Sequence, residues 1–357
     1  MTDQNQPATT PPDPTPVLDD PGEFIASIPA ILGFIPHRSL VVAMLGMPAG
    51  QKVGVIRAVL RGDLHDLEQV VDSVARACAA NGADAVLVVL VDDQEQPTAP
   101  GDLVLMALQD GLDGIPVRGA WAVRRIAAGQ RWHSLRPPHR DGLMPDPSTT
   151  VIALHRVYEG RQLHTGRRDI EDLLAPLPAL ADAVDQHLEA AKSENDPSPD
   201  SDPQARTRDR VESVFAMVAA QHAGAVLSSR ALADIVVFWR ESAVRDATLA
   251  LAGTIFADTA EELATTLTRA STGTDRAHAA AVLAFLAYHR GDGVLAGIAI
   301  DAALTADAHH SLAALLGAAL DSAMPVTRIQ ALARQTRDAL TAAGVSLPPS
   351  AASPDQS

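Results

Sequence analysis

Short apolar runs alternate with polar turns over the first half of the chain, and they predict strands. The segments SLVVAML (39–45) and KVGVIRAVL (52–60) are rich in β-branched residues and are separated by GMPAGQ, so they predict a β-hairpin. DAVLVVLVDD (84–93) is a continuous Val/Leu run, typical of a central parallel strand that is buried on both faces. Two further strands are predicted in 116–126 and 130–135, on either side of a short AAG turn.

Helical spacing of apolar residues fills the gaps between these strands. Residues 63–82 have such a stripe, with Asp63 as the predicted N-cap and Gly82 as the predicted terminator. Helices are also predicted for 101–114 and 168–193. The resulting order, β-β-α-β-α-β-β-α, predicts an α/β fold class: a mixed sheet packed with helices.

The second half, from about 206 to 345, has helical periodicity throughout and predicts an all-α helical domain. Small residues fall where a tetratricopeptide-like hairpin places its close helix contacts: Ala284, Gly291, Ala296 and Ala303. Only one such unit is recognisable, and repeat arrays need several units to bury their faces. The sequence therefore predicts a single helical hairpin in a small bundle.

Segments rich in Pro, Asp and Ser mark the expected domain boundaries. They predict a disordered leader (1–20), an α/β domain (21–191), a linker (192–205), the helical domain (206–345) and a disordered tail (346–357).

Charge and composition weigh against several classes of protein. The 357 residues carry a formal net charge of −16, which disfavours binding to nucleic acid and to anionic membranes. The single cysteine, Cys78, has no intrachain disulfide partner, and its apolar neighbours predict an inert, buried thiol. The N-terminus has no secretory-signal pattern, and no apolar run reaches the roughly 18 residues that cross a bilayer. We therefore expect a cytoplasmic protein.

The short motifs of the commonest nucleotide-binding, hydrolase and zinc classes are absent from the sequence. It contains no Gly-x-Gly-x-x-Gly after a strand, no phosphate loop ending in Lys-Ser/Thr, no Gly-x-Ser-x-Gly and no His-Glu-x-x-His. The sequence identifies no cofactor.

Two adjacent carboxylates, Asp92 and Asp93, follow the predicted central strand. Ligands of open α/β sheets bind outside the carboxyl ends of strands, and paired carboxylates there have the oxygen chemistry of a divalent-metal site. The alternative is a solvated turn, because Asp often opens turns.

A basic segment stands out against the acidic average. Residues 114–140 contain no Asp or Glu but contain Arg118, Arg124, Arg125, Arg131, Arg136 and Arg140 together with His133 and His139. In the predicted hairpin Arg125 and Arg131 flank the turn and are placed to face one anion. The alternative is that these arginines are exposed charges that protect an edge strand.

The turn before the first strand is the other candidate site. Gly33 is expected to end a helix, Pro36 to stiffen the turn and Ser39 to hydrogen-bond the loop before the strand. The side chains of His37 and Arg38 are expected to be exposed at the strand entry, so a functional role narrows to His37, Arg38 and Ser39. The candidate anion-binding residues are therefore Arg38, Ser39, Arg125, Arg131 and His133. In the helical half, the doublet His309–His310 is interpreted as the start of a helix, because adjacent helical residues point about 100° apart.

Four segments resemble an uncharacterised family of Ala/Arg-rich proteins from high-GC Gram-positive bacteria: IPAILGFIPHRSLVVAML, ADAVLVVLVDD, AWAVRRIAAGQRWHSL and STTVIALHRVYEGRQL. The hallmark Leu-Gly-Phe-x-Pro-x-x-Ser-Leu-Val is present as Leu32, Gly33, Phe34, Pro36, Ser39, Leu40 and Val41. The resemblance covers most of the chain and implies no activity, because the family is a domain of unknown function. Many relatives have cysteines after the Arg-Trp segment, whereas this chain has RPPHRDGLMPDP, so no metal or redox role is carried over.

Two functions remain open from the sequence. The favoured one is a non-enzymatic cytoplasmic binding or scaffold protein whose partner is a protein or a small anionic ligand. The alternative is an enzyme that acts on a phosphorylated or otherwise anionic small molecule, with its site near Ser39, Asp92 and the Arg118–Arg140 segment. The alternative predicts that these segments converge in space.

Overall fold

The computed structural model describes residues 20–47, 54–94, 100–158, 164, 166–195 and 202–351. The strands are β1 (Ser39–Gly46), β2 (Val55–Asp63), β3 (Ala85–Val91), β4 (Val117–Val123), β5 (Arg131–Ser134) and β6 (Asp141–Leu143). The helices of this half are α1 (Pro21–Leu32), α2 (Leu67–Asn81), α3 (Gly101–Gly111), α4 (Val151–Tyr158), α5 (Arg167–Leu173) and α6 (Pro178–Glu194), with short 3₁₀ turns η1 (Leu64–Asp66) and η2 (Pro147–Thr149). The predicted α/β fold class is confirmed.

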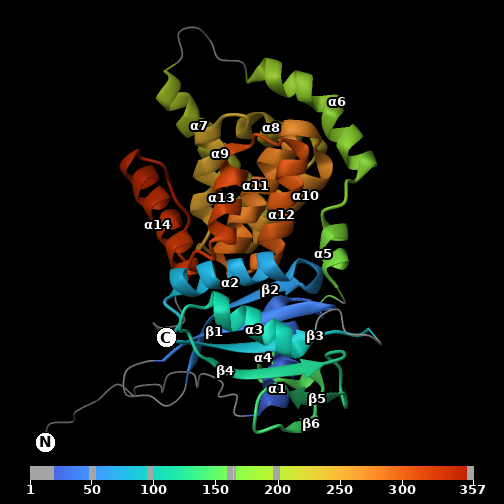
Figure 1. Ribbon diagram of the computed structural model, residues 1–357. Helices are drawn as coiled ribbons and strands as arrows, with labels where there is room; N and C mark the ends of the chain where they lie inside the picture. The colour runs from blue at the N-terminus through green and yellow to red at the C-terminus, as the bar shows by residue number, and fades with distance from the viewer. Residues whose placement is uncertain are drawn as a thin grey trace, which may run out of the picture.

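The strands form one six-stranded mixed sheet in the order β2-β1-β3-β4-β5-β6. β3 and β4 are parallel, whereas the other neighbours are antiparallel, so the predicted hairpin and the predicted central strand are both confirmed. In Figure 1 the β2 side of the sheet lies toward the helical half and β6 lies farthest from it.

Alternate side chains of the buried strands pack on the two faces of the sheet. Leu40 and Val42 of β1 belong to a cluster with α2 and α3, whereas Val41 and Ala43 belong to a cluster with α1. The second cluster continues into the helices of the second half. This alternation is what the period-two geometry of a strand produces.

Three elements differ from the predicted ones. β6 and α4 were not predicted, and the single helix predicted for 168–193 is two helices, α5 and α6. The break falls at Leu174–Leu177, where Pro176 interrupts the pattern and Pro178 starts α6. Proline has no backbone N–H to donate, so it fits the first turn of a helix and not its interior.

The second half is helical, as predicted. Its helices are α7 (Pro203–His222), α8 (Ser229–Trp239), α9 (Ser242–Thr248), α10 (Ala257–Ala270), α11 (Gly273–His289), α12 (Gly293–Ala306), α13 (Ser311–Asp321) and α14 (Val326–Ala342), with η3 (Leu249–Leu251) after α9. α11 is buried on nearly all sides and pairs with α12 through a turn at Gly291, so the predicted helical hairpin is present. Its likeness to a tetratricopeptide unit stays a prediction.

The expected non-globular segments lie partly outside the described residues. The predicted leader does so apart from Asp20, and residues 196–201 of the predicted linker and 352–357 of the predicted tail do so as well. The linker's flanks differ from the prediction, because α6 continues to Glu194 and α7 begins at Pro203. Residues 346–351 also differ, since a bridge between Thr254 and Ser350 holds this strap against the helical half. No helix within the described part of the chain is both long and apolar enough to cross a bilayer.

Candidate functional site

One row of paired residues crosses the sheet at a single end. Ser39 of β1 pairs with Asp63 of β2 and with Val91 of β3, Val91 pairs with Val123 of β4, and Val123 pairs with Trp132 of β5. The carboxyl ends of β3 and β4 therefore meet the amino ends of β1 and β5. We call this end the carboxyl edge. It is where open α/β sheets bind ligands.

The turn before β1 presents His37 and Arg38 at the carboxyl edge. Both side chains are exposed, as expected, and Gly33 ends α1 in the left-handed conformation with φ 85°. Arg38 has φ 43°, which is uncommon for a residue with a Cβ. Its carbonyl oxygen accepts from Leu64 N at 3.1 Å, so the conformation is fixed by the start of η1. Such strain clusters at functional sites.

Ser39 is fully buried beneath this turn. Its hydroxyl donates to His37 O at 2.7 Å and accepts from Arg61 Nε at 2.7 Å. Arg61 Nη2 also donates to His37 O at 3.3 Å and lies 3.6 Å from the Asp63 carboxylate. Ser39 thus differs from the expectation of an anion ligand: its hydroxyl holds the turn in place and does not reach solvent.

Three segments that are far apart in the sequence meet at the carboxyl edge. His37 Nδ1 lies 3.8 Å from Asp93 Oδ2, and Arg124 Nη2 donates to Asp93 O at 3.1 Å. Arg38 Nη1 lies 3.4 Å from His65 Nε2. The structure therefore brings the turn, the Asp pair and one end of the basic segment together, from β1 through β3 to β4.

The basic segment itself is divided between the two ends of the sheet. Arg124 and Arg125 follow β4 and Arg131 starts β5, so these three lie at the carboxyl edge. Arg118 is the second residue of β4 and lies at the opposite end, as does Arg136, which donates to Val117 O. Arg140 precedes β6 and its carbonyl oxygen accepts from Ser134 N, so it lies level with Trp121 in the second half of β4, and His139 lies beside it in the chain. His133 is an exposed residue within β5. Arg125 and Arg131 flank the turn as expected, but Arg131 is paired with Asp141 at 2.5 Å.

Asp92 and Asp93 end β3 at the carboxyl edge. Asp92 Oδ1 accepts from Gln94 N at 3.2 Å, which is the geometry of an Asx turn. The described residues contain no group of three or more His, Cys, Asp or Glu side chains that is able to hold a metal ion. The role of Asp92 and Asp93 as metal ligands stays a prediction.

A second polar cluster lies inside the helical half, and the sequence patterns did not reveal it. Arg245, His278 and His310 come from α9, from α11 and from the N-cap of α13, up to 65 residues apart. The interpretation of His309–His310 as a helix start is confirmed, because His310 Nδ1 accepts from Ala313 N at 3.2 Å. No spacing rule points from there to His278, so only the folded chain shows the contact.

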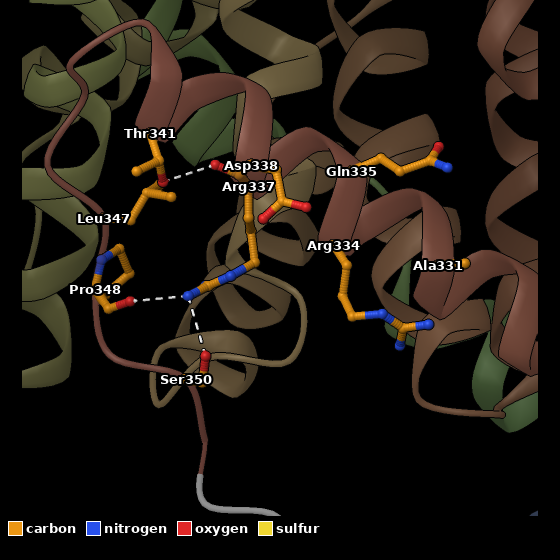
Figure 2. Close-up of a pocket in the computed structure, with 9 residues that line it drawn as sticks. All are labelled: Ala331, Arg334, Gln335, Arg337, Asp338, Thr341, Leu347, Pro348 and Ser350. Carbon is orange, nitrogen blue, oxygen red and sulfur yellow. Dashed lines mark hydrogen bonds between the residues drawn. The ribbon is translucent and has the colours of Figure 1, made fainter.

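A groove of about 600 Å³ runs between α14 and the strap of residues 346–351 (Figure 2). Arg337 crosses it and donates to Pro348 O at 3.4 Å and to Ser350 Oγ at 3.1 Å. Arg334, one turn away in α14, also lines the groove. The bonds of Arg337 tie the strap to α14, so the groove is an anchor for the C-terminal strap.

By its architecture the protein is a mixed α/β domain followed by a helical bundle, with charged turns at the carboxyl edge of the sheet. Residues 21–326 match the family model described as a domain of unknown function (DUF4192). The chain belongs to this family, and the matched residues include the whole sheet and the helices through α13. Comparison with curated proteins and with solved structures gave no match.

Proposed function

We propose that this protein is a non-enzymatic binding protein that takes an acidic segment of a protein partner along the carboxyl edge. The observation that carries the proposal is the presence there of two exposed guanidinium groups, Arg38 and Arg125, with no carboxylate partner among the described residues. Arg38 is held in a left-handed conformation by the bond from Leu64 N to its carbonyl oxygen, and the Arg125 side chain has no hydrogen bond or ion pair with the described residues.

The spacing of the strands favours an extended ligand over a small one. Arg38 precedes β1 and Arg125 follows β4, with β3 between them. Neighbouring strands lie about 4.8 Å apart, so the two arginines start roughly 10 Å from each other along the edge. Successive carboxylates of an acidic peptide span such a distance, and guanidinium groups bind carboxylates with good geometry.

The same geometry gives little support for catalysis. His37 and Asp93 are 51% and 40% exposed and their nearest atoms are 3.8 Å apart, which is beyond a hydrogen bond. Ser39 is buried, and its only proton is donated to His37 O. A nucleophile needs a neighbouring base within hydrogen-bond reach, and Ser39 has a carbonyl and a guanidinium instead.

The proposal is tested with a fluorescein-labelled decaglutamate peptide and fluorescence anisotropy at low and moderate salt. The edge variant Arg38→Asn/Arg125→Gln removes two charges, and Asn accepts the left-handed conformation at position 38. The control Arg118→Gln/Arg140→Gln removes two exposed charges of the same basic segment that do not follow or precede a strand end at the carboxyl edge. We expect the edge variant to weaken binding by at least about fivefold and the control by less than about twofold.

Equal weakening in both variants, or no binding by the unmodified protein, contradicts the proposal. Equal weakening would mean that the peptide responds to the net charge of the protein and not to the arginines of the carboxyl edge.

One observation favours a second candidate function, an enzyme acting on a phosphorylated small molecule. The segments that this candidate needs do meet, through the His37–Asp93 and Asp93–Arg124 contacts. It predicts that inorganic pyrophosphate raises the melting temperature and that His37→Gln/Arg124→Gln abolishes the rise. A flat response to pyrophosphate together with decaglutamate binding leaves the binding protein as the function.

A further inference from the structure

α13 begins at the buried polar cluster of Arg245, His278 and His310. Arg245 and His310 are 6% and 4% exposed, and His278 is partly buried. His278 Nδ1 lies 2.8 Å from His310 Nε2, and Arg245 Nη1 lies 3.2 Å from the same His278 nitrogen. His310 and Arg245, from two other segments, therefore both contact the same imidazole nitrogen, His278 Nδ1.

The hydrogen bonds determine where the imidazole protons are. His310 Nδ1 accepts from Ala313 N–H, so it carries no proton, and the proton of the neutral ring is on Nε2. That N–H donates to His278 Nδ1, which must also be free of a proton. Arg245 is always charged and donates to the same acceptor. The bonds to His278 Nδ1 and the bond from Ala313 N are satisfied together only when both imidazoles are neutral. Arg245 Nη1 then lies 3.4 Å from His310 Nε2, as a second donor beside the same acceptor.

Protonation of either ring removes an acceptor that the cluster needs. A proton on His278 Nδ1 would face the His310 N–H and the Arg245 guanidinium, which are both donors. A proton on His310 Nδ1 would end the bond from Ala313 N and leave α13 without its N-cap. Both changes also place a second positive charge beside the buried guanidinium.

The acidic groups around the cluster already have donors of their own. Asp246 of α9 accepts from Arg245 Nε at 2.8 Å, Asp275 of α11 accepts from Arg240 Nε at 2.9 Å, and Asp307 accepts from His309 N at 3.0 Å. Burial and then Arg245 lower the pKa of His278 to about 4, while Asp275 and Asp307 oppose this only in part. The pKa of His310 is lowered by burial and by Arg245, against Asp307 and Asp246.

We propose that this cluster is a proton-sensitive latch, in which neutral His278 and His310 hold the start of α13 against α9 and α11, and protonation releases it. Release of α13 also bears on the contact between the two halves of the molecule, because the segment just after α13 contacts the sheet half. Asn81 Nδ2 at the end of α2 donates to Ala323 O at 2.8 Å. The cluster thus holds one end of α13, and the segment that follows the other end contacts the sheet half.

Hydrogen exchange of the full-length protein at pH 7.5 and pH 5.0, corrected for intrinsic rates, tests the latch. At pH 5 a histidine with an ordinary pKa of 6.5 in the open state and about 4 in the closed state favours opening by roughly 10- to 30-fold. We expect the protection of α13 amides to fall by that factor relative to α8, whose segment contains no histidine. Equal protection of α13 at both pH values overturns the proposal.

Two variants separate the latch from general acid sensitivity. His278→Gln/His310→Asn removes both titrating rings, and Asn keeps a side-chain acceptor at the N-cap. We expect its α13 protection to be independent of pH, whereas His309→Asn, the exposed neighbour, keeps the dependence of the unmodified protein. An unchanged pH dependence in the double variant overturns the proposal.

Because that variant removes a buried network, an NMR titration of the unmodified protein is the second test. An ordinary pKa near 6.5 for folded His278 also overturns the proposal.

Discussion

The hydroxyl of Ser39 and the guanidinium of Arg61 form a 2.7 Å hydrogen bond between two adjacent strands, directly beneath the turn of His37 and Arg38 at the carboxyl edge. The same hydroxyl donates to His37 O, so one serine connects the edge strand β2 to the turn that presents His37 and Arg38. This relationship explains a serine at the first position of a buried strand. Its role is to position the charges of its neighbours.

Ser39→Ala should destabilise the protein by about 1 to 3 kcal/mol, because it leaves Arg61 Nε without its acceptor in a partly buried site. Burial lowers the pKa of Arg61, so this guanidinium is already poorly hydrated. Urea denaturation measures the loss. The control Ser346→Ala removes an exposed serine and should stay within about 0.5 kcal/mol of the unmodified protein. Similar losses in both variants would contradict the positioning role.

Gly33→Ala should cost about 1 to 2 kcal/mol of folding free energy, because residue 33 ends α1 with φ 85°. A Cβ there would also lie 3.2 Å from Nη2 of Arg156, whose Nη1 donates to Ala30 O at 2.7 Å. Gly166→Ala is the matched control, since its φ of −167° suits any residue and its Cβ would meet nothing within 4 Å. Thermal unfolding compares the two variants. An unchanged melting temperature for Gly33→Ala would contradict the role of Gly33 as the left-handed C-cap of α1.

The sequence predicted the elements that have a local pattern of apolar residues. It did not predict elements whose formation depends on pairing with other parts of the chain. The strands at 39–45 and 84–93 and the left-handed caps at Gly33 and Gly82 follow from periodicity and backbone rules, and the structure contains them. β6 has only three residues and exists through its pairing with β5. α4 presents Leu154, Val157 and other apolar residues to solvent, so its pattern does not resemble that of an amphipathic surface helix.

The candidate site was predicted in part for the same reason. The sequence placed Arg38, Asp93 and Arg125 at the ends of strands, and the strand order then brought those ends together. A hydrogen bond from Ser39 to its turn was expected and is present, but no local signal shows that Arg61, 22 residues later, also requires its hydroxyl. His278 and His310 are 32 residues apart on different helices, and their contact depends on how α11 and α13 pack.

Cys78 should be unreactive in the folded protein and reactive only after unfolding. Its side chain is fully buried between α2 and the sheet, and burial raises the pKa of the thiol to about 11. At pH 8 the folded thiol is therefore protonated as well as inaccessible, whereas a free cysteine is partly thiolate. Mass spectrometry after treatment with iodoacetamide at pH 8, with and without urea, measures this. Rapid alkylation without urea would show that α2 opens readily from the sheet.

Arg337→Ala should release the C-terminal strap while leaving the helical bundle folded. Arg337 donates to Pro348 O and to Ser350 Oγ from one side, whereas backbone bonds from Ile255 N to Pro349 O and from Ala351 N to Gly253 O hold the strap from the other. Loss of the guanidinium removes both of its bonds to the strap, so amides of residues 346–351 should exchange faster by about fivefold or more. Arg334→Ala removes an exposed arginine one turn away in the same groove and should leave strap exchange unchanged. Faster strap exchange in both variants would mean that the charge of α14, and not the bonds of Arg337, holds the strap.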